Sequence, residues 1–122
     1  MGNHILIIAE LARQKKYRNI IFSKDAEKDL QEIIAMVSTN LNNTVTVLKT
    51  PEEIMIKGII EREDYIDNKV KEARDRHLER FHSGICRAEA GPVFVEMLIH
   101  LERISDHCNN IAEYILTYWR NQ

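Results

Sequence analysis

The chain has 122 residues, of which 44% are hydrophobic and 30% charged, which is enough for one folded domain with a hydrophobic core but not for two. Nineteen acidic residues against seventeen basic ones give a net charge of −2, and this balance argues against the concentrated basic face that a nucleic-acid partner needs. The longest apolar run, residues 5–9, is too short to span a bilayer. Two cysteines do not make a disulfide framework, so we expect reduced thiols and a cytoplasmic protein.

The first predicted element is a short helix over residues 3–14. It is apolar on most sides, with Ile5, Leu6, Ile7, Ile8 and Leu11. A helix of this kind needs a cover, either from the rest of the chain or from a second copy. We therefore expect a homo-oligomer formed through this segment.

The second helix is predicted to begin after Ser23 as its N-cap, with Asp25 and Glu27 favoured in the first turn by the helix dipole. Residues 45–48 are rich in β-branched side chains, but they continue the helical period and are predicted as helix. The predicted apolar stripe is Ala26, Leu30, Ile33, Val37, Leu41, Thr44 and Leu48.

The third helix is predicted to start at the sequence Thr50-Pro51-Glu52-Glu53, which resembles a capping box with proline at the first helical position. It should run to about His82 and stop at Gly84. Its predicted inner stripe is Ile56, Ile59, Glu63, Ile66, Val70, Ala73, His77 and Phe81.

The fourth helix is predicted to start between Ala88 and Pro92 and to run to the C-terminus. Its apolar seam is Leu101, Ile104, Cys108, Ile111 and Ile115. Short loops between long helices make sequential helices antiparallel neighbours. The predicted fold is therefore all-α, an antiparallel up-and-down helical bundle of three long helices plus a short N-terminal helix, forming one domain over residues 1–122.

Two acidic pairs lie beside the predicted core. Glu63 interrupts the stripe of the third helix and Asp67 follows one turn later, while Glu102 and Asp106 have the same spacing on the fourth helix. Burying an unpaired charge costs several kcal/mol, so such carboxylates must be protonated, paired with a base or bound to a cation. A third pair with this spacing, at residues 25 and 29, is interpreted as lying on the solvent-facing side of the second helix.

Two interpretations of these acids stay open from the residues alone. In the first, the glutamates reach solvent or pair with arginines such as Arg62, Arg74 or Arg103. In the second, the two helices supply oxygen ligands to a cation. Carboxylate sets suit Fe³⁺, Mn²⁺, Mg²⁺ or Ca²⁺, and Zn²⁺ when histidine is added.

The histidines and the remaining polar residues indicate no enzyme. His77 falls on an apolar stripe and is expected to be a core histidine. His100 and His107 are two turns apart, and neither has a histidine one turn away, which argues against a zinc site. The sequence has no phosphate-cradling glycine loop and no nucleophile with a base and an orienting group.

The segment HLERISDHCNNIAEYI, residues 100–115, resembles the L-E-R-I-G-D-H and N-I-A-E signature of PhoU-type domains. These are all-helical regulators of phosphate uptake whose Glu/Asp-x-x-x-Asp motifs hold multinuclear metal clusters. Ser105 stands where glycine is usual. The resemblance implies a metal ion or cluster, with Fe³⁺ favoured, at Glu63, Asp67, Glu102 and Asp106, and Asn110 and Glu113 as outer ligands.

Residues 73–91 resemble the inter-helix region of PhoU-like domains at the C-terminus of sodium/phosphate cotransporter-family membrane proteins. This resemblance implies a phosphate transporter, or the membrane portion of a parent protein, as partner, and a location at the cytoplasmic face of the membrane. Residues 1–16 resemble the last helix of a preceding bundle, with residues 23–121 as the three-helix bundle, so we expect a C-terminal portion of a larger protein. The alternative is a structural interaction or dimerisation module without metal.

Overall fold

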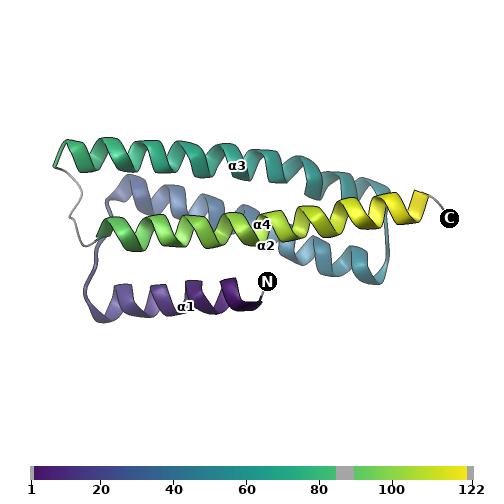
Figure 1. The fold of residues 1–122 in the computed structure, drawn as a ribbon, viewed down its shortest axis with the longest axis horizontal. Coiled ribbons are helices and arrows are strands. Elements are labelled where there is room, and N and C mark those ends of the chain that lie inside the picture. Colours follow the sequence, from purple (N-terminus) through teal and green to yellow (C-terminus); the bar gives the residue numbers. More distant parts are fainter. Residues whose placement is uncertain (1, 85–89, 121–122) are drawn as a thin grey trace.

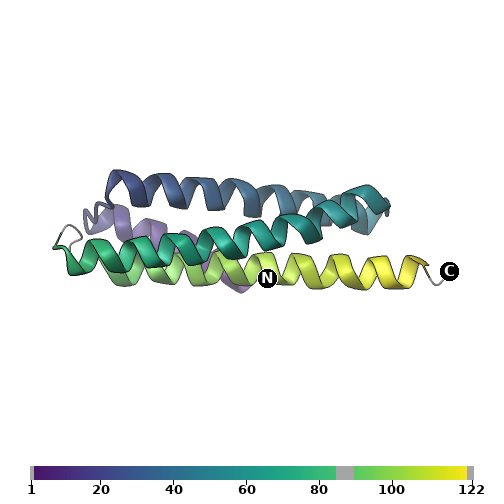
Figure 2. The ribbon, with the colours of Figure 1, turned by 90° about the horizontal axis from the view of Figure 1, so that it is seen from above.

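The computed structural model describes residues 2–84 and 90–120, which form four α-helices (Figure 1). These are α1 (Gly2–Tyr17), α2 (Lys24–Lys49), α3 (Glu53–His82) and α4 (Ala90–Arg120). The chain runs up and down, so that α3 is antiparallel to both α2 and α4, and α1 packs along α4 (Figures 1 and 2). The prediction of an all-α bundle with three long helices and a short first one is confirmed.

Local chemistry sets most of the helix ends. The Ser23 hydroxyl accepts the N–H of Ala26 at 3.1 Å, as expected for the N-cap of α2. Gly84 has a φ of 74°, a left-handed conformation that glycine adopts readily, and it follows α3 where the stop was predicted. The predicted start of the third helix, with a capping box at residues 50–53 and Pro51 as its first helical residue, is wrong, because α3 begins at Glu53. The N–H of Thr50 instead donates to the carbonyl of Thr46 at 2.8 Å and closes α2.

Apart from Asp29, the buried positions of α2 follow a seven-residue repeat. They alternate between steps of four and three residues: Ala26, Leu30, Ile33, Val37, Asn40, Thr44 and Val47. The predicted stripe is wrong at two positions, because Leu41 is only half-buried and Leu48 is 59% exposed, whereas Thr44 between them is buried as predicted. Helices that wrap around one another keep a 3.5-residue period at their seam. The buried positions Asn40 and Val47 therefore lie one residue before the predicted positions Leu41 and Leu48.

The inner face of α3 has the same repeat, and the predicted stripe from Ile56 to His77 is buried except for the half-buried Glu63. The side chain of Phe81, and Cys86 and Ala88, lie outside the described residues. Cys108 on α4 is a buried free thiol, as expected for a small core residue. Earlier in the same helix, Phe94 and Leu98 are also fully buried in the core.

Asn40 is a polar residue in the centre of the α2–α3 seam. It is fully buried, and its amide nitrogen donates to the carbonyl of Ile59 at 3.2 Å. Its side-chain oxygen accepts from Arg62 at 2.9 Å. Both ends of the buried amide are therefore satisfied, and Arg62, one of the predicted partners of the acidic residues, is bound to Asn40 instead.

The interpretation of Asp29 as a solvent-facing residue is wrong. It is only 6% exposed, and its carboxylate accepts two hydrogen bonds from the Arg76 guanidinium, at 2.9 and 3.1 Å. Lys69 lies 3.8 Å from the same carboxylate. The partners come from α3, so the pairing depends on how α2 and α3 align. The helical period of α2 alone contains no information about it.

Helix α1 is only partly covered. Leu11 joins the core and Ile8 packs against it, whereas Ile5, Leu6 and Ile7 are 43%, 68% and 38% exposed. An exposed apolar face is consistent with association, and the predicted homo-oligomer stays a prediction. Within residues 2–84 and 90–120, every helix is too short or too polar to cross a membrane.

The Asp29–Arg76 pair makes a testable contribution to stability. Replacing Asp29 by alanine leaves the Arg76 guanidinium without its bidentate partner, so the free energy of unfolding should fall by about 1–3 kcal/mol. The measurement is urea unfolding followed by circular dichroism. Asp25→Ala, one turn earlier and exposed, is the matched control and should cost less than about 1 kcal/mol. Equal losses in the two variants would contradict the assignment.

Candidate metal centre

Three carboxylates meet where α3 packs against α4. Glu63 and Asp67 lie one turn apart on α3, and Asp106 comes from α4. One carboxylate oxygen from each of the three lies within 4.8 Å of the others. Glu63 takes the position in the seven-residue repeat between Ile59 and Ile66, so the packing that buries these isoleucines also turns it toward the interface.

The environment of this cluster disfavours its full negative charge. Burial raises the pKa of Glu63 to about 8, and the neighbouring Asp106 and Asp67 carboxyls add to the shift. Burial also raises the pKa of Asp67, together with the charge of Asp106. Like charges held close together in a partly desolvated site cannot all ionise freely. The cluster therefore needs either protons or a cation.

One oxygen of the cluster has no partner. The Oδ1 atom of Asp67 is buried and accepts no hydrogen bond within the described part of the chain. Such orphaned acceptors are uncommon and point to an unfilled interaction. The donor set consists of oxygen atoms only, which suits hard or borderline cations such as Fe³⁺, Mn²⁺, Mg²⁺ and Ca²⁺. The residues present therefore fit a bound metal ion.

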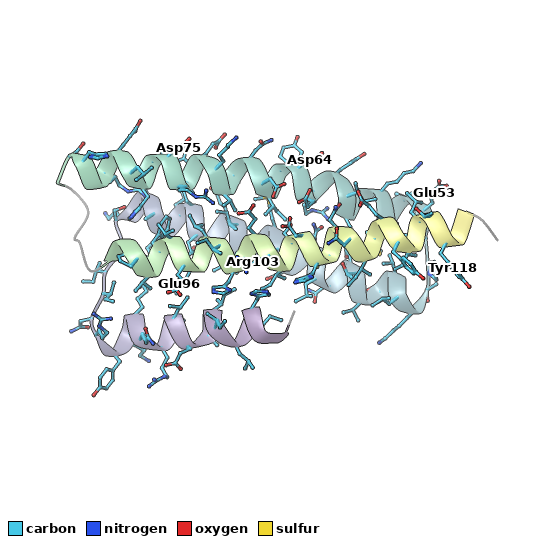
Figure 3. All side chains as sticks on the ribbon, in the orientation of Figure 1. Glu53, Asp64, Asp75, Glu96, Arg103 and Tyr118 are labelled. Carbon is cyan, nitrogen blue, oxygen red and sulfur yellow. The ribbon has the colours of Figure 1, made fainter. Side chains whose placement is uncertain are left out.

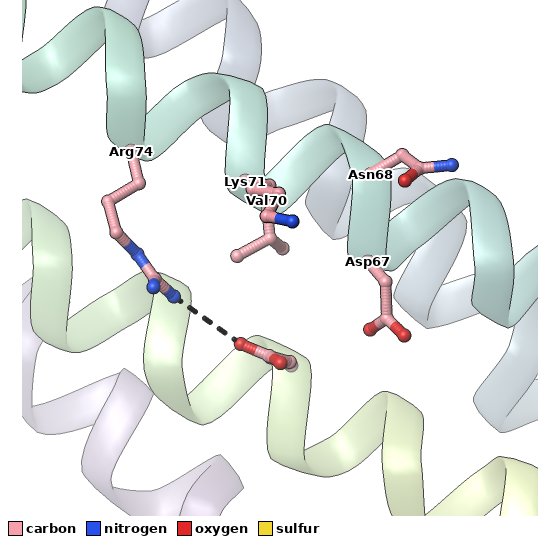
Figure 4. Close-up of a pocket in the computed structure, with 6 residues that line it drawn as sticks. Asp67, Asn68, Val70, Lys71 and Arg74 are labelled. Carbon is pink, nitrogen blue, oxygen red and sulfur yellow. Dashed lines mark ion pairs between the residues drawn. The ribbon is translucent and has the colours of Figure 1, made fainter.

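Glu102, the fourth predicted ligand, lies beside the cluster. It lines a cavity of about 250 Å³ together with Asp67, whose carboxylate points toward α4 (Figure 4). Its own carboxylate forms an ion pair with Arg74, at 3.6 Å. Burial raises the pKa of Glu102, and the charges of Asp67 and Asp106 raise it further. The structure thus brings three of the four predicted ligands together and holds the fourth on an arginine.

The two predicted outer ligands, Asn110 and Glu113, are exposed on α4, one and two turns beyond Asp106. Their role stays a prediction. Sequence reasoning missed Asn109, which also lies one turn from Asp106 and has a buried side-chain oxygen without a hydrogen-bond partner. Ser105 is fully buried, and its hydroxyl lacks a partner as well. No signal in the sequence distinguishes Asn109 from Asn110, because each lies within one turn of Asp106.

His77 is the core histidine that the sequence predicts. It is 3% exposed and its ring packs against that of Phe94, with 5.0 Å between the ring centroids. Burial lowers the pKa of His77, and the nearby Arg80 lowers it further. A neutral ring packed among apolar side chains agrees with a structural role.

The raised pKa of Glu63 predicts how the stability of the metal-free protein depends on pH. Between its ordinary value of 4.5 and about 8, the folded state holds a proton that the unfolded state has lost. The free energy of unfolding should therefore fall as the pH rises through this range, by on the order of 1–2 kcal/mol after solvent screening. Urea unfolding in the presence of a chelator measures the profile.

Glu63→Gln should flatten this profile, whereas Glu61→Gln, at an exposed site on the same helix, should leave it unchanged. A wild-type profile without a slope in this range would contradict the burial of Glu63 among like charges.

Of the comparisons with known proteins, the one with protein families finds a match. Searches of curated proteins and of solved structures find no significant match. The PhoU domain family matches residues 30–115, more than two thirds of the chain. The matched segment begins within α2, ends within α4 and contains all three carboxylates of the cluster. The chain belongs to the PhoU domain family.

Proposed function

We propose that this chain is a metal-binding regulatory module of phosphate uptake. The observation that carries the proposal is the cluster of Glu63, Asp67 and Asp106, whose carboxylate oxygens gather within 4.8 Å across the α3–α4 interface. A bound cation supplies positive charge at this point. The side chains hold it from both helices, so that occupancy of the site is coupled to the packing of α3 on α4.

Glu102 is the proposed fourth ligand. Asp67 and Glu102 line the same cavity, so the space between them is open. We expect that a change of the Glu102 side-chain rotamer carries its carboxylate through this space, away from Arg74 and toward the cluster. The ion pair with Arg74 is partly exposed, with 44% and 36% of the two side chains accessible, and such pairs are weak. Arg74 therefore competes with the cation for Glu102 at small energetic cost.

The proposed ion is Fe³⁺ or a cluster containing it, with Mn²⁺, Mg²⁺, Ca²⁺ and Zn²⁺ as competitors. Three carboxylates carry up to three negative charges, and a trivalent ion offsets the most repulsion among them. Oxygen ligands alone do not separate Fe³⁺ from Mn²⁺ by geometry, so elemental analysis of the purified protein decides the identity of the metal.

Family membership supports the link to phosphate transport. The proposed partner is a phosphate transporter or the membrane portion of a parent protein of the sodium/phosphate cotransporter type, contacted at the cytoplasmic face of the membrane. Metal occupancy would set the stability of the α3–α4 pair and hence the surface that the partner contacts. This role requires binding and no catalysed reaction.

A second candidate function is a structural interaction module without metal. Two observations favour it: Arg74 already pairs with Glu102, and the apolar face of α1 exposes Ile5, Leu6 and Ile7. In that case the purified chain contains no stoichiometric metal and associates through α1. Metal content together with solution mass separates the two functions.

Metal should stabilise the wild-type chain. At a free concentration 100 times the dissociation constant, a single bound ion adds about 2.7 kcal/mol to the free energy of unfolding. Thermal unfolding with and without Mn²⁺, and with Fe³⁺ supplied as citrate, measures the effect. The double variant Asp67→Ala/Asp106→Ala should lose the response, because two of the three clustered ligands are gone.

Asp64→Ala/Asp75→Ala is the matched control, since both residues are exposed on α3 (Figure 3). It removes the same number of negative charges from the protein, so a nonspecific charge effect would appear in both double variants. A metal response in Asp67→Ala/Asp106→Ala equal to that of wild type would show that the site is assigned wrongly.

The same two double variants test the link to phosphate in cells. When each replaces the natural chain, uptake of labelled phosphate should change in Asp67→Ala/Asp106→Ala and stay at the wild-type level in Asp64→Ala/Asp75→Ala. Equal uptake in the two strains would contradict a regulatory role for the metal centre.

Arg74 should limit the affinity of the site. Arg74→Gln removes a positive charge and releases Glu102, so metal should bind more tightly, by roughly tenfold, which corresponds to about 1.4 kcal/mol. Isothermal titration with Mn²⁺ measures the change. Arg18→Gln is the control, since Arg18 is exposed just beyond the end of α1 and is not among the charges that act on Glu102. Weaker binding in Arg74→Gln would indicate that Arg74 positions Glu102 for the metal.

A further inference from the structure

Three histidines gather on the opposite side of α4 from the carboxylate cluster, where α1 packs. His4 comes from α1, and His100 and His107 come from α4. The Nδ1 atoms of His4 and His100 are 2.8 Å apart and share a hydrogen bond, in which one ring donates to the other. The ring centroid of His4 lies 5.1 Å from that of His100 and 5.7 Å from that of His107.

The ring-centroid separations are close to those of imidazoles that share a metal ion, whereas the two Nδ1 atoms are closer together because they share a hydrogen bond. With metal–nitrogen bonds of about 2.0–2.1 Å and tetrahedral angles, donor nitrogens lie roughly 3.4 Å apart and ring centroids roughly 5 Å apart. His4 and His100 meet this spacing with a small adjustment. His107 is exposed, so a change of rotamer can bring its ring closer.

The sequence argument against zinc considered α4 alone, where His100 and His107 are two turns apart. Side chains at this spacing project from the same face of a helix. Helix α1 places His4 within ring contact of both, and so provides the histidine that α4 lacks. Three residues that form no metal motif in the sequence become neighbours in the folded chain. Among the described residues only the carboxylate cluster has three donor atoms within 4.8 Å of one another, so His107 must change its rotamer to complete a histidine site.

The chemistry of this group differs from that of the acidic cluster. Its donors are imidazole nitrogens, which suit Zn²⁺, Ni²⁺ and Cu²⁺ better than hard cations. Burial and the neighbouring His100 lower the pKa of His4, which favours the neutral ring that ligates metals. Arg103 lies on the same side of α4 (Figure 3) and contributes a positive charge that tempers the affinity.

We propose that His4 and His100, with His107 as third ligand, form a second metal site that takes Zn²⁺ and ties α1 to α4. Water completes the coordination, as in three-histidine sites generally. The site gives α1, whose apolar face is only partly covered, a metal-dependent attachment to the bundle. It is independent of the carboxylate centre, because the two donor sets share no residue.

The decisive titration uses the full chain with the acidic cluster removed by Asp67→Asn/Asp106→Asn. Isothermal titration with Zn²⁺ should show one ion per chain. In this background, His4→Asn or His100→Asn should weaken Zn²⁺ binding by at least roughly 10- to 100-fold. That is the loss expected when a residue that only supports a metal ligand is replaced, and a ligand itself should matter at least as much. His82→Asn, which removes an exposed imidazole at the far end of α3, should leave the affinity unchanged.

A second measurement on the wild-type chain does not depend on these variants. One equivalent of Zn²⁺ should shift the imidazole ¹⁵N resonances of His4 and His100 and leave those of the buried His77 in place. The proposal is overturned if His4 and His100 do not shift, or if their substitution leaves Zn²⁺ affinity unchanged in the background variant. Either failure leaves the carboxylate centre unaffected, because that centre is tested with Mn²⁺ and different variants.

Discussion

The packing of α3 against α4 places carboxylates in a seam that otherwise buries apolar side chains. Glu63 occupies a repeat position whose neighbours Ile59 and Ile66 are fully buried. Burying these isoleucines stabilises the bundle by roughly 1.5–3 kcal/mol per side chain, and the backbone that achieves this carries Glu63 and Asp67 toward Asp106. Charge repulsion at the site is thus a consequence of core packing.

The polar residues in the bundle interior fall into two groups. Asn40 and Asp29 have their hydrogen bonds satisfied by residues of α3, which fits a role in fixing how the helices align. Asp67, Ser105 and Asn109 each have a buried oxygen without a hydrogen-bond partner in the part of the chain that the structure describes. Unsatisfied groups cost free energy. Two buried nitrogens of Arg80 lack a partner there as well, so such groups are not confined to the surroundings of the α3–α4 carboxylates.

Helix α4 carries two different donor sets on two faces. Asp106 turns toward α3 and joins oxygen donors, whereas His100 and His107 turn toward α1 and join a third imidazole. Successive residues of a helix are rotated by about 100°, so Asp106 and His107 belong to different surfaces although they are adjacent in the chain. One stretch of α4 therefore presents carboxylate oxygens to α3 and imidazole nitrogens to α1.

The sequence by itself determined the helices, their approximate ends and the all-α bundle, because caps, stop signals and apolar periodicity act within a few residues of the chain. It also indicated the four acids of the proposed centre, through their position beside the predicted apolar seams and through the resemblance to PhoU-type domains. The tertiary structure decided which of them meet: Glu63, Asp67 and Asp106 come together, and Glu102 pairs with Arg74. It also decided that Asp29 is buried on Arg76 and that His4 reaches His100. Contacts between helices depend on how two seams align, and the periodicity of a single helix carries no information about its partner.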